Sequence, residues 1–231
     1  MIRIELICTG EELLTGHTIN TNQSDISTLL SHYGLHIKRV HTVGDQLEEI
    51  ESVIKDVLSR ADICLMTGGL GPTKDDNTIE ALAKAMKVEL VENKERDAHI
   101  KDFFKKRGKK APFSNKKQAL APVSSQQLSN PIGTAMGIHC QHQSKMVLCL
   151  PGVPRECLKM MKEQVVPLFK SKIPSLNGRC IKIFKSELGE SEIADRLRAL
   201  YPLSNQCEIA YKPTLSDVEI TLSAPKSEEI S

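Results

Sequence analysis

The chain has 231 residues, of which 40% are hydrophobic and 26% are charged, and its formal net charge is +2. This composition is typical of a globular protein that is long enough to bury a substantial core. Aromatic residues make up only 3%, which leaves no stacking platform for single-stranded nucleic acid, so we expect no nucleic-acid partner. We recognise neither a long apolar span nor a signal peptide, and therefore expect a cytoplasmic protein without a membrane partner.

The seven cysteines include no Cys-x-x-Cys pair, and several lie within apolar runs. This pattern favours reduced thiols in the core over disulfides or a zinc site. The cysteines are Cys8, Cys64, Cys140, Cys149, Cys157, Cys180 and Cys207.

Strands and helices alternate in the first part of the chain. Residues 2–8 predict a strand, and a helix from about Asn22 to Gly34 follows a polar loop. Residues 35–43 predict a second, less buried strand, and the apolar spacing from Leu47 to Leu58 predicts a second helix. A third strand starts at Ile63. Such alternation predicts a doubly wound, mostly parallel sheet with helices on both faces.

A loop with three glycines and a proline, Thr67 to Asp76, separates the third strand from its helix. Glycines allow close backbone approach, so amide N–H groups can converge there on a phosphate. Asp75 and Asp76 would repel that phosphate unless a divalent cation lies between them and the ligand. The alternative is that the two aspartates cap the helix. The loop matches neither a Walker A motif nor a dinucleotide fingerprint.

Two further strand ends carry a glycine turn and an acid. They are Thr9-Gly10-Glu11 and Gly44-Asp45. Because the carboxyl ends of parallel strands lie along one edge of a sheet, these turns and the glycine loop predict a shared acidic site.

A helix from about Asn93 to Arg107 leads into a basic run at residues 105–117, which holds seven Lys or Arg residues and no acid. The run is either a solvated loop or a rim that attracts phosphate, for which Lys116 and Lys117 are the best-placed cations. A short helix is expected between Ser114 and Pro122.

The turn-rich segment 128–137 precedes two strands, 138–141 and 145–150. The second strand ends in a turn, residues 151–156, that delivers charged residues to a helix start. The apolar spacing from Leu158 to Leu168 predicts that helix.

A Pro, Ser, Asn and Gly-rich stretch at residues 172–178 predicts a linker. We therefore expect a first domain at residues 1–171 and a small α+β domain at residues 178–231. Strands are expected at 180–184, 207–211 and 218–222, and a helix at 190–200. The last residues, 224–231, have the composition of a helix start, so we expect the small domain to be incomplete or the chain to be a fragment.

Several motifs together resemble the N-terminal region of the competence/damage-inducible CinA family, whose domain is similar to the molybdopterin-binding MoaB/MogA fold. The motifs are Thr9-Gly10-Glu11-Glu12-Leu13-Leu14, Asn20-Thr21-Asn22, Val43-Gly44-Asp45, Thr67 to Asp76, Asn130-Pro131-Ile132-Gly133-Thr134-Ala135 and Leu150-Pro151-Gly152-Val153-Pro154.

The resemblance implies a homo-oligomer and a metal-dependent pyrophosphatase that cleaves ADP-ribose, or a related dinucleotide, to AMP and ribose 5-phosphate. Longer family members add a nicotinamide-nucleotide amidase domain, which we do not find here, so we expect no deamidase activity. Two departures from the family pattern are Glu11, where the family has Asp, and Met136, where it has Pro.

The hypothesis that follows assigns Mg²⁺, as the divalent metal, to carboxylates at the three strand ends, with Lys74 or Lys117 offsetting charge on the leaving phosphate. The expected metal ligands are Asp45, Asp75, Asp76 and Glu11, and the expected catalytic residues are Asp45, Asp76 and Lys117. The expected ligand-binding residues are Thr9, Gly10, Glu11, Asn20, Thr67, Gly68, Gly69, Gly71, Thr73, Asn130, Pro151 and Gly152.

Two alternatives remain open. One is a molybdopterin-binding protein of molybdenum-cofactor assembly. The other is a non-catalytic module that binds a nucleotide or docks a partner.

Overall fold

In the computed structural model the described residues are 2–173, 179–198, 207–214 and 216–225. They belong to two compact units, Met1–Thr28 with His36–Lys172, and Leu29–Leu35 with Ile173–Ser231. The domain boundaries expected from the sequence stay predictions.

The larger unit is built on one six-stranded sheet. Its strands are β1 (Ile4–Thr9), β2 (Ile37–Val43), β3 (Ile63–Thr67), β6 (Gln126–Leu128), β7 (Gly137–His142) and β8 (Lys145–Leu150). They pair in the order β2-β1-β3-β8-β7-β6. The first four in this order are parallel, and β7 and β6 are added by antiparallel pairing. The mostly parallel α/β sheet expected from the alternation is confirmed.

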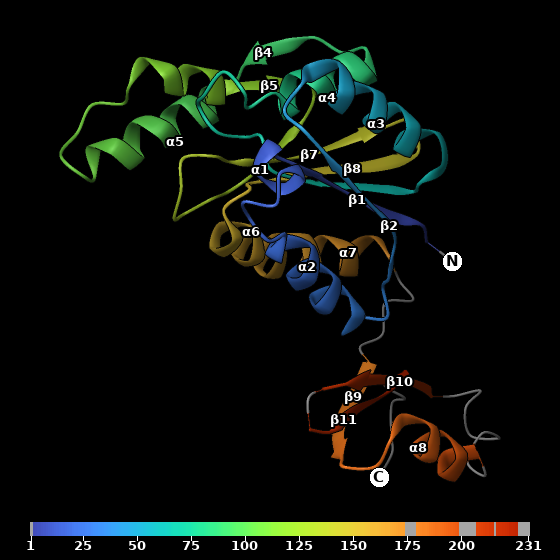
Figure 1. The fold of residues 1–231 in the computed structure, drawn as a ribbon. Helices are drawn as coiled ribbons and strands as arrows, with labels where there is room; N and C mark the ends of the chain where they lie inside the picture. The colour runs from blue at the N-terminus through green and yellow to red at the C-terminus, as the bar shows by residue number, and fades with distance from the viewer. Residues whose placement is uncertain (1, 174–178, 199–206, 215, 226–231) are drawn as a thin grey trace. The chain divides into compact units, whose positions relative to one another are not determined.

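Helices cover both faces of this sheet (Figure 1). On one face lie α3 (Leu47–Arg60) and α4 (Thr78–Met86). On the other face lie α2 (Thr21–Ser31), α6 (Pro154–Met160) and α7 (Val166–Lys172), and one π-helical turn joins the last two. A single helical turn, α1 (Glu11–Leu14), follows β1.

How deeply a strand is buried depends on its position in the sheet. Every residue of β1 and β3 is buried, because helices cover both faces of the sheet centre. The edge strand β2 is only partly buried, as its polar residues indicated. On α3, the buried residues Ile50, Ile54 and Val57 repeat at helical spacing and face the core.

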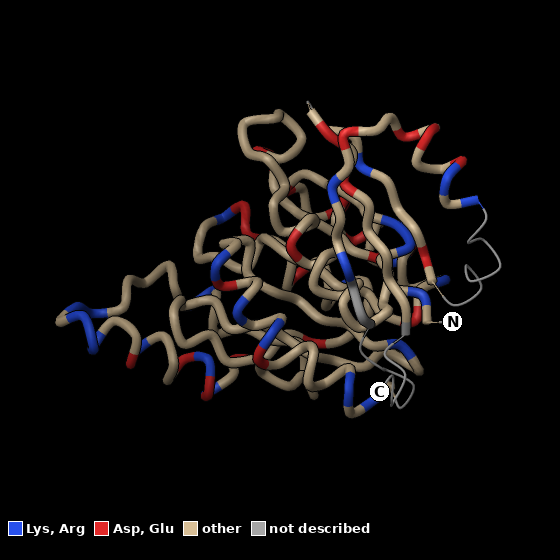
Figure 2. The backbone as a smooth tube through the Cα atoms, turned by 90° about the horizontal axis from the view of Figure 1, so that it is seen from below, with Lys and Arg blue, Asp and Glu red and all other residues tan. Residues whose placement is uncertain are grey.

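An arm extends from the larger unit (Figure 1). It consists of α5 (Lys94–Lys105), a loop and the 3₁₀ helix η1 (Phe113–Ala119), and its base includes the strand pair β4 (Leu90–Glu92) and β5 (Leu120–Pro122). Basic residues gather at the tip of the arm (Figure 2). Residues 105–110 are all exposed, as expected of a solvated loop.

The described residues 179–225 of the smaller unit form a three-stranded antiparallel sheet and one helix. It contains β9 (Arg179–Ser186), α8 (Glu190–Leu197), β10 (Glu208–Pro213) and β11 (Val218–Pro225). The strand order is β10-β11-β9. This confirms the expected α+β elements. Most of the expected linker, the end of the expected helix at 190–200 and the expected helix start after Pro225 lie outside the described residues.

Five cysteines are buried free thiols, which confirms the expectation of reduced core thiols for these five, and Cys207 is a half-buried free thiol. Burial raises the pKa of Cys140 and Cys157 to about 12, so these thiols stay protonated at neutral pH. The side chain of Cys180 is not among those described. In the described part of the chain, no helix is both long and apolar enough to cross a membrane.

A buried ion-pair network joins the sheet to α3. Glu5 on β1 is 1% exposed, and its two carboxylate oxygens accept hydrogen bonds of 2.8 Å from Arg60 Nε and Nη2. His41 Nε2 lies 2.9 Å from Glu5 Oε2. Burial acts to raise the pKa of Glu5, but the hydrogen bonds and charges of Arg60 and His41 outweigh it, so the pKa lies below its ordinary value of 4.5.

We expect Glu5→Gln to lower the free energy of unfolding at pH 7 by about 1–3 kcal/mol, because Arg60 loses its carboxylate partner. Since the folded pKa lies below the unfolded one, the stabilisation is present above about pH 4.5 and is lost as the pH falls further. Urea unfolding between pH 7 and pH 3 should therefore show a smaller acid loss in the variant than in the wild type. Glu51→Gln, at a surface pair with Lys55, is the control. Equal acid sensitivity of Glu5→Gln and the wild type would contradict this prediction.

Candidate functional site

Four parallel strands end at one edge of the sheet. Thr9 pairs with Val43, and Thr67 pairs with Leu150, so the loops that follow β1, β2, β3 and β8 start at the same level. The sequence predicted three of these ends as a shared site. The fourth brings the Pro-Gly-Val-Pro turn to the same edge.

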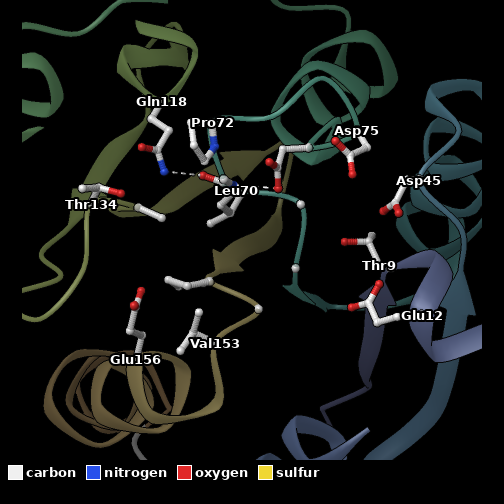
Figure 3. A pocket seen from close by; sticks show the side chains of 18 residues that line it. Thr9, Glu12, Asp45, Leu70, Pro72, Asp75, Gln118, Thr134, Val153 and Glu156 are labelled. Carbon is white, nitrogen blue, oxygen red and sulfur yellow. Dashed lines mark hydrogen bonds between the residues drawn. The ribbon is translucent and has the colours of Figure 1, made fainter. Parts of the chain in front are cut away.

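A cavity of about 390 Å³ lies at this edge (Figure 3). Ten of the residues expected to form the site line it: Thr9, Gly10, Asp45, Gly68, Gly69, Gly71, Asp75, Asp76, Pro151 and Gly152. Six expected residues do not line it: Glu11, Asn20, Thr67, Thr73, Lys117 and Asn130. The sequence therefore predicted where the cavity lies, but only part of the set of residues that line it.

Two glycines in the loop after β3 lie too close to their neighbours to carry a side chain. Gly68 has a φ of +103°, and a Cβ there would lie 2.3 Å from the Thr9 carbonyl oxygen. Gly69 has a φ of +64°, and its Cβ would lie 2.2 Å from Thr78 Oγ1. Thr78 Oγ1 in turn donates to the Gly68 carbonyl at 2.9 Å. Only glycine fits these positions, as the sequence indicated.

Two amide groups of the same loop remain available to a ligand. The N–H of Gly68 donates to the Leu150 carbonyl at 3.1 Å, which fixes the loop to β8. Within the described residues, the next two amides, of Gly69 and Leu70, have no hydrogen-bond acceptor. Successive free amides of this kind attract an anion.

Asp76 closes the loop on itself. Its Oδ1 accepts the Gly71 N–H at 2.8 Å, and its Oδ2 accepts both the Thr73 N–H at 2.8 Å and the Thr73 hydroxyl. Both carboxylate oxygens are therefore engaged within the loop. The alternative interpretation, that Asp75 and Asp76 cap the next helix, is wrong, because α4 begins at Thr78 and its N-cap residue is Asn77.

Asp75 is the freer of the two aspartates. It is exposed and lines the cavity. Its pKa is lowered, first by a hydrogen bond with Thr73, then by backbone hydrogen bonding and the charge of Lys117. It is therefore a carboxylate at neutral pH.

Asp45 holds the start of α1. Its Oδ2 accepts the Glu11 N–H at 3.0 Å, and its own carbonyl accepts a hydrogen bond from the Asn77 side chain at 2.9 Å. The Glu11 side chain packs over Gly44, where a Cβ would lie 2.6 Å from Glu11 Oε2. The next residue, Glu12, lines the cavity instead.

The expected metal ligands do not form a ready cation site. Within the described residues, no group of three His, Cys, Asp or Glu side chains is arranged to hold a metal ion. Backbone N–H groups also occupy oxygens of Asp45 and Asp76. The divalent metal therefore stays a prediction.

The arm braces the ligand loop through η1. Lys117 Nζ donates to the carbonyls of Thr73 and Lys74 at 2.9 and 3.1 Å. Gln118 Nε2 donates to the Leu70 carbonyl at 2.9 Å. Lys117 was expected to face phosphate, but its ammonium group donates hydrogen bonds to loop carbonyls and does not line the cavity.

Arg96, on α5, holds η1 in place by a hydrogen bond to Gln118. It is 1% exposed, and its Nε donates to the Gln118 carbonyl at 2.6 Å. Its Nη1 donates to the Gln127 side chain and the Met136 carbonyl, both at 2.9 Å. Burial lowers the pKa of Arg96 to about 10, so it stays charged at neutral pH.

The other expected residues outside the cavity position its walls. Asn20 Oδ1 accepts the Gln23 N–H at 3.1 Å in the first turn of α2. Thr67 Oγ1 donates to the Pro151 carbonyl at 2.9 Å and joins β3 to the turn after β8. Asn130 is fully buried and organises the turn at residues 130–135.

Sequence reasoning missed eight residues of the cavity wall. They are Glu12, Leu70, Pro72, Gln118, Thr134, Ala135, Val153 and Glu156. Most lie next to residues that were expected there, and Glu156 follows the Pro-Gly-Val-Pro turn that was seen to deliver charge to a helix. Among the described residues, the wall thus carries five carboxylates, from Glu12, Asp45, Asp75, Asp76 and Glu156, and no Lys, Arg or His side chain.

Residues 5–171 match the family model of the probable molybdopterin binding domain. The chain belongs to this family. A solved structure of CinA from Thermoplasma acidophilum, a protein of unknown function, superimposes on this chain with a TM-score of 0.66 at 35% identity. The match covers 74% of this chain and 97% of that one. The expected CinA-like, MoaB/MogA-like domain is confirmed.

Two further relatives bear on the domain. A MoaB molybdopterin biosynthesis enzyme from Thermus thermophilus has a TM-score of 0.51 at 18% identity, over 74% of this chain and 94% of that one, which supports the fold alone. The nicotinamide-nucleotide amidohydrolase PncC of Shewanella oneidensis is 37% identical over 96% of this chain and 53% of its own length. The chain spans about half the length of the curated relatives that it matches.

The prediction of an ADP-ribose pyrophosphatase is wrong. The curated relative is named for amide hydrolysis, and the family model and the MoaB structure are named for molybdopterin. That activity came from the family resemblance and not from the geometry of this domain. The names of these relatives also give no support for magnesium as a ligand of the domain.

We expect Gly68→Ala to lower the free energy of unfolding by about 2–5 kcal/mol, since the new Cβ meets the Thr9 carbonyl and φ is positive. Gly16→Ala is the matched control, because Gly16 also has a positive φ, +75°, but nothing lies within 4 Å of its Cβ position. Urea unfolding of both variants measures the difference. Equal losses would mean that the contact with Thr9 contributes nothing.

We expect Asp76→Ala to destabilise the domain by about 1–3 kcal/mol, because the N–H groups of Gly71 and Thr73 lose their acceptor. Asp75→Ala removes a neighbouring carboxylate that holds no such pair and should cost less. Thermal unfolding of the two variants tests the order. A larger loss for Asp75→Ala would refute the role given to Asp76.

Proposed function

We propose that this domain binds a small heterocyclic ligand of the pterin type in the cavity at the carboxyl ends of β1, β2, β3 and β8. The observation that carries the proposal is the composition of the wall, which combines five carboxylates with two free amides and no basic side chain. The description of the family as a probable molybdopterin binding domain supports it. A cavity of about 390 Å³ is within the usual size range of small-molecule sites.

The carboxylates favour a ligand that brings hydrogen-bond donors. Ionised carboxylates only accept hydrogen bonds, so a ligand that is rich in carbonyl and phosphate oxygens would give no donor to the carboxylate oxygens of the wall that the protein leaves free. A pterin ring offers an exocyclic amino group and ring N–H groups. Such donors form charge-assisted hydrogen bonds with carboxylates, which are stronger than those between neutral groups.

The free amides suit an anionic substituent of the same ligand. The amides of Gly69 and Leu70 belong to residues that line the cavity and have no acceptor within the described residues. Backbone N–H groups bind a phosphate or carboxylate without requiring a basic side chain. A pterin with an anionic side group would thus bind both to the carboxylates and to the free amides of the cavity wall.

We propose binding and not catalysis for this domain. Of the residues expected to catalyse, Asp76 uses both carboxylate oxygens to hold its own loop, and Lys117 donates to loop carbonyls. Asp45 binds the start of α1. These roles support a structural function for all three residues.

A nucleotide is the second candidate ligand. The relative from Shewanella oneidensis is named a nicotinamide-nucleotide amidohydrolase, and a nicotinamide nucleotide combines the NH₂ donor of its carboxamide with a phosphate. Homo-oligomer formation stays a prediction for either ligand.

We expect the chain to bind 6-carboxypterin and Val153→Trp to weaken that binding at least about tenfold, because the larger side chain fills the cavity. Val153 is 53% exposed, so the fold should tolerate the change. Isothermal titration calorimetry measures both affinities, with nicotinamide mononucleotide titrated in parallel.

The matched control is Val123→Trp, because Val123 is 45% exposed and does not line the cavity. Its affinity should equal that of the wild type. No binding of 6-carboxypterin by the folded chain would overturn the pterin proposal, and binding of the nucleotide alone would favour the second candidate.

A further inference from the structure

Glu156 lies apart from most other carboxylates of the cavity. It belongs to the first turn of α6, and Figure 3 shows its side chain directed into the cavity beside Val153. Glu12, Asp45 and Asp75 lie together on the opposite side in the same view. Glu156 therefore meets a different part of any ligand from the part that meets those three.

The direction of the Glu156 carboxylate is set by Asn130. Asn130 Nδ2 donates to Glu156 Oε2 at 2.7 Å and to the Ala135 carbonyl at 3.0 Å. Asn130 Oδ1 accepts the Gly133 N–H at 3.0 Å. The side chain of Asn130 is fully buried, and an inverted amide would face this N–H with its own donors and the carboxylate with its own oxygen. Asn130 thus presents a fixed donor to Glu156.

The backbone of Gly133 closes one side of the carboxylate. A Cβ on Gly133 would lie 2.3–2.5 Å from the carboxylate atoms of Glu156, and Gly133 is buried. Among the described residues, the Glu156 side chain accepts its hydrogen bond from Asn130 and from no amide of α6, so the helix start does not account for its position. Asn130 and Gly133 together hold the group where it is.

One oxygen of Glu156 is left for a ligand. Oε2 is held by Asn130, whereas Oε1 has no hydrogen-bond partner among the described residues. Glu156 is half-buried and lines the cavity, so an acceptor that is already oriented faces the space where a ligand binds. Oε2 keeps a second acceptor site beside the one that Asn130 fills, because each carboxylate oxygen has two lone pairs. The oriented carboxylate can therefore accept from two adjacent N–H donors in parallel.

We propose that Glu156 is the specificity-determining residue of the cavity and selects ligands with a 2-aminopyrimidin-4-one ring. That ring carries a ring N–H beside an exocyclic amino group, and it occurs in pterins and in guanine. A 2-oxo analogue puts a carbonyl oxygen in place of the amino group, which repels the carboxylate. The inference rests on the proposed function, because it names the chemical group of the ligand that the same cavity recognises.

The test compares 6-carboxypterin with 6-carboxylumazine, which differ in the 2-amino and 2-oxo groups. The wild type should bind the pterin about tenfold to a hundredfold more tightly, the range expected for charge-assisted hydrogen bonds. In Glu156→Gln, the donor of Asn130 requires the glutamine to turn its carbonyl oxygen toward Asn130 and its NH₂ group into the cavity. The variant should therefore lose the preference or reverse it in favour of the lumazine.

Glu163→Gln is the control, because Glu163 lies in the turn after α6, pairs with Lys159 on the surface and does not line the cavity. It should keep the preference of the wild type. A second pair of ligands, guanosine and inosine monophosphate, distinguishes a purine from a pterin as the source of the ring. A preference for the guanosine compound that Glu156→Gln abolishes, without pterin binding, supports the role of Glu156 and overturns the pterin ligand.

Equal affinity of the wild type for pterin and lumazine, or an unchanged ratio in a folded Glu156→Gln, would overturn the inference while the proposed binding function stands. No binding of any of the four compounds would overturn both. Thermal unfolding of Glu156→Gln, measured beside the titrations, confirms that the ratio is read from folded protein.

Discussion

The ligand cavity depends on a contact between backbones. Gly68 lies against the end of β1 so closely that a single added carbon would lie 2.3 Å from the Thr9 carbonyl oxygen. A Cβ on Gly152, in the turn after β8, would lie 3.2 Å from Gly68 Cα. Three strand ends therefore meet without a side chain between them. This packing brings the loop after β3 to the centre of the edge, and the side chains of the wall are arranged around it.

The wall of the cavity is acidic, whereas the basic residues of the larger unit lie elsewhere. One cluster of exposed basic residues lies at the tip of the arm, and Lys117 and Arg96 donate hydrogen bonds to carbonyl groups behind the loop. Recognition in the cavity is thus left to carboxylates and backbone amides. A wall of this kind distinguishes ligands by where their hydrogen-bond donors lie more than by their net charge.

Much of the fold could be predicted from the sequence, because the long buried strands and the amphipathic helices carry clear periodicity. The three-residue strands β4, β5 and β6 are too short to show a period, and the π-helical turn interrupts a helix that otherwise looks continuous. The glycine loop was predictable, but the partners of its acids were not, since Asp76 bonds to backbone N–H groups that every sequence has. Contacts such as Lys117 with Thr73 or Asn130 with Glu156 join distant segments, and no local pattern marks them.

The brace that η1 provides has a consequence for the thermodynamics of binding. Lys117 and Gln118 hold the carbonyls of Leu70, Thr73 and Lys74 before any ligand arrives. A ligand that meets a loop already in its bound shape loses little free energy to ordering it, so more of its contact energy remains as affinity. Preorganisation of this kind makes the arm part of the binding apparatus although Lys117 itself does not line the cavity.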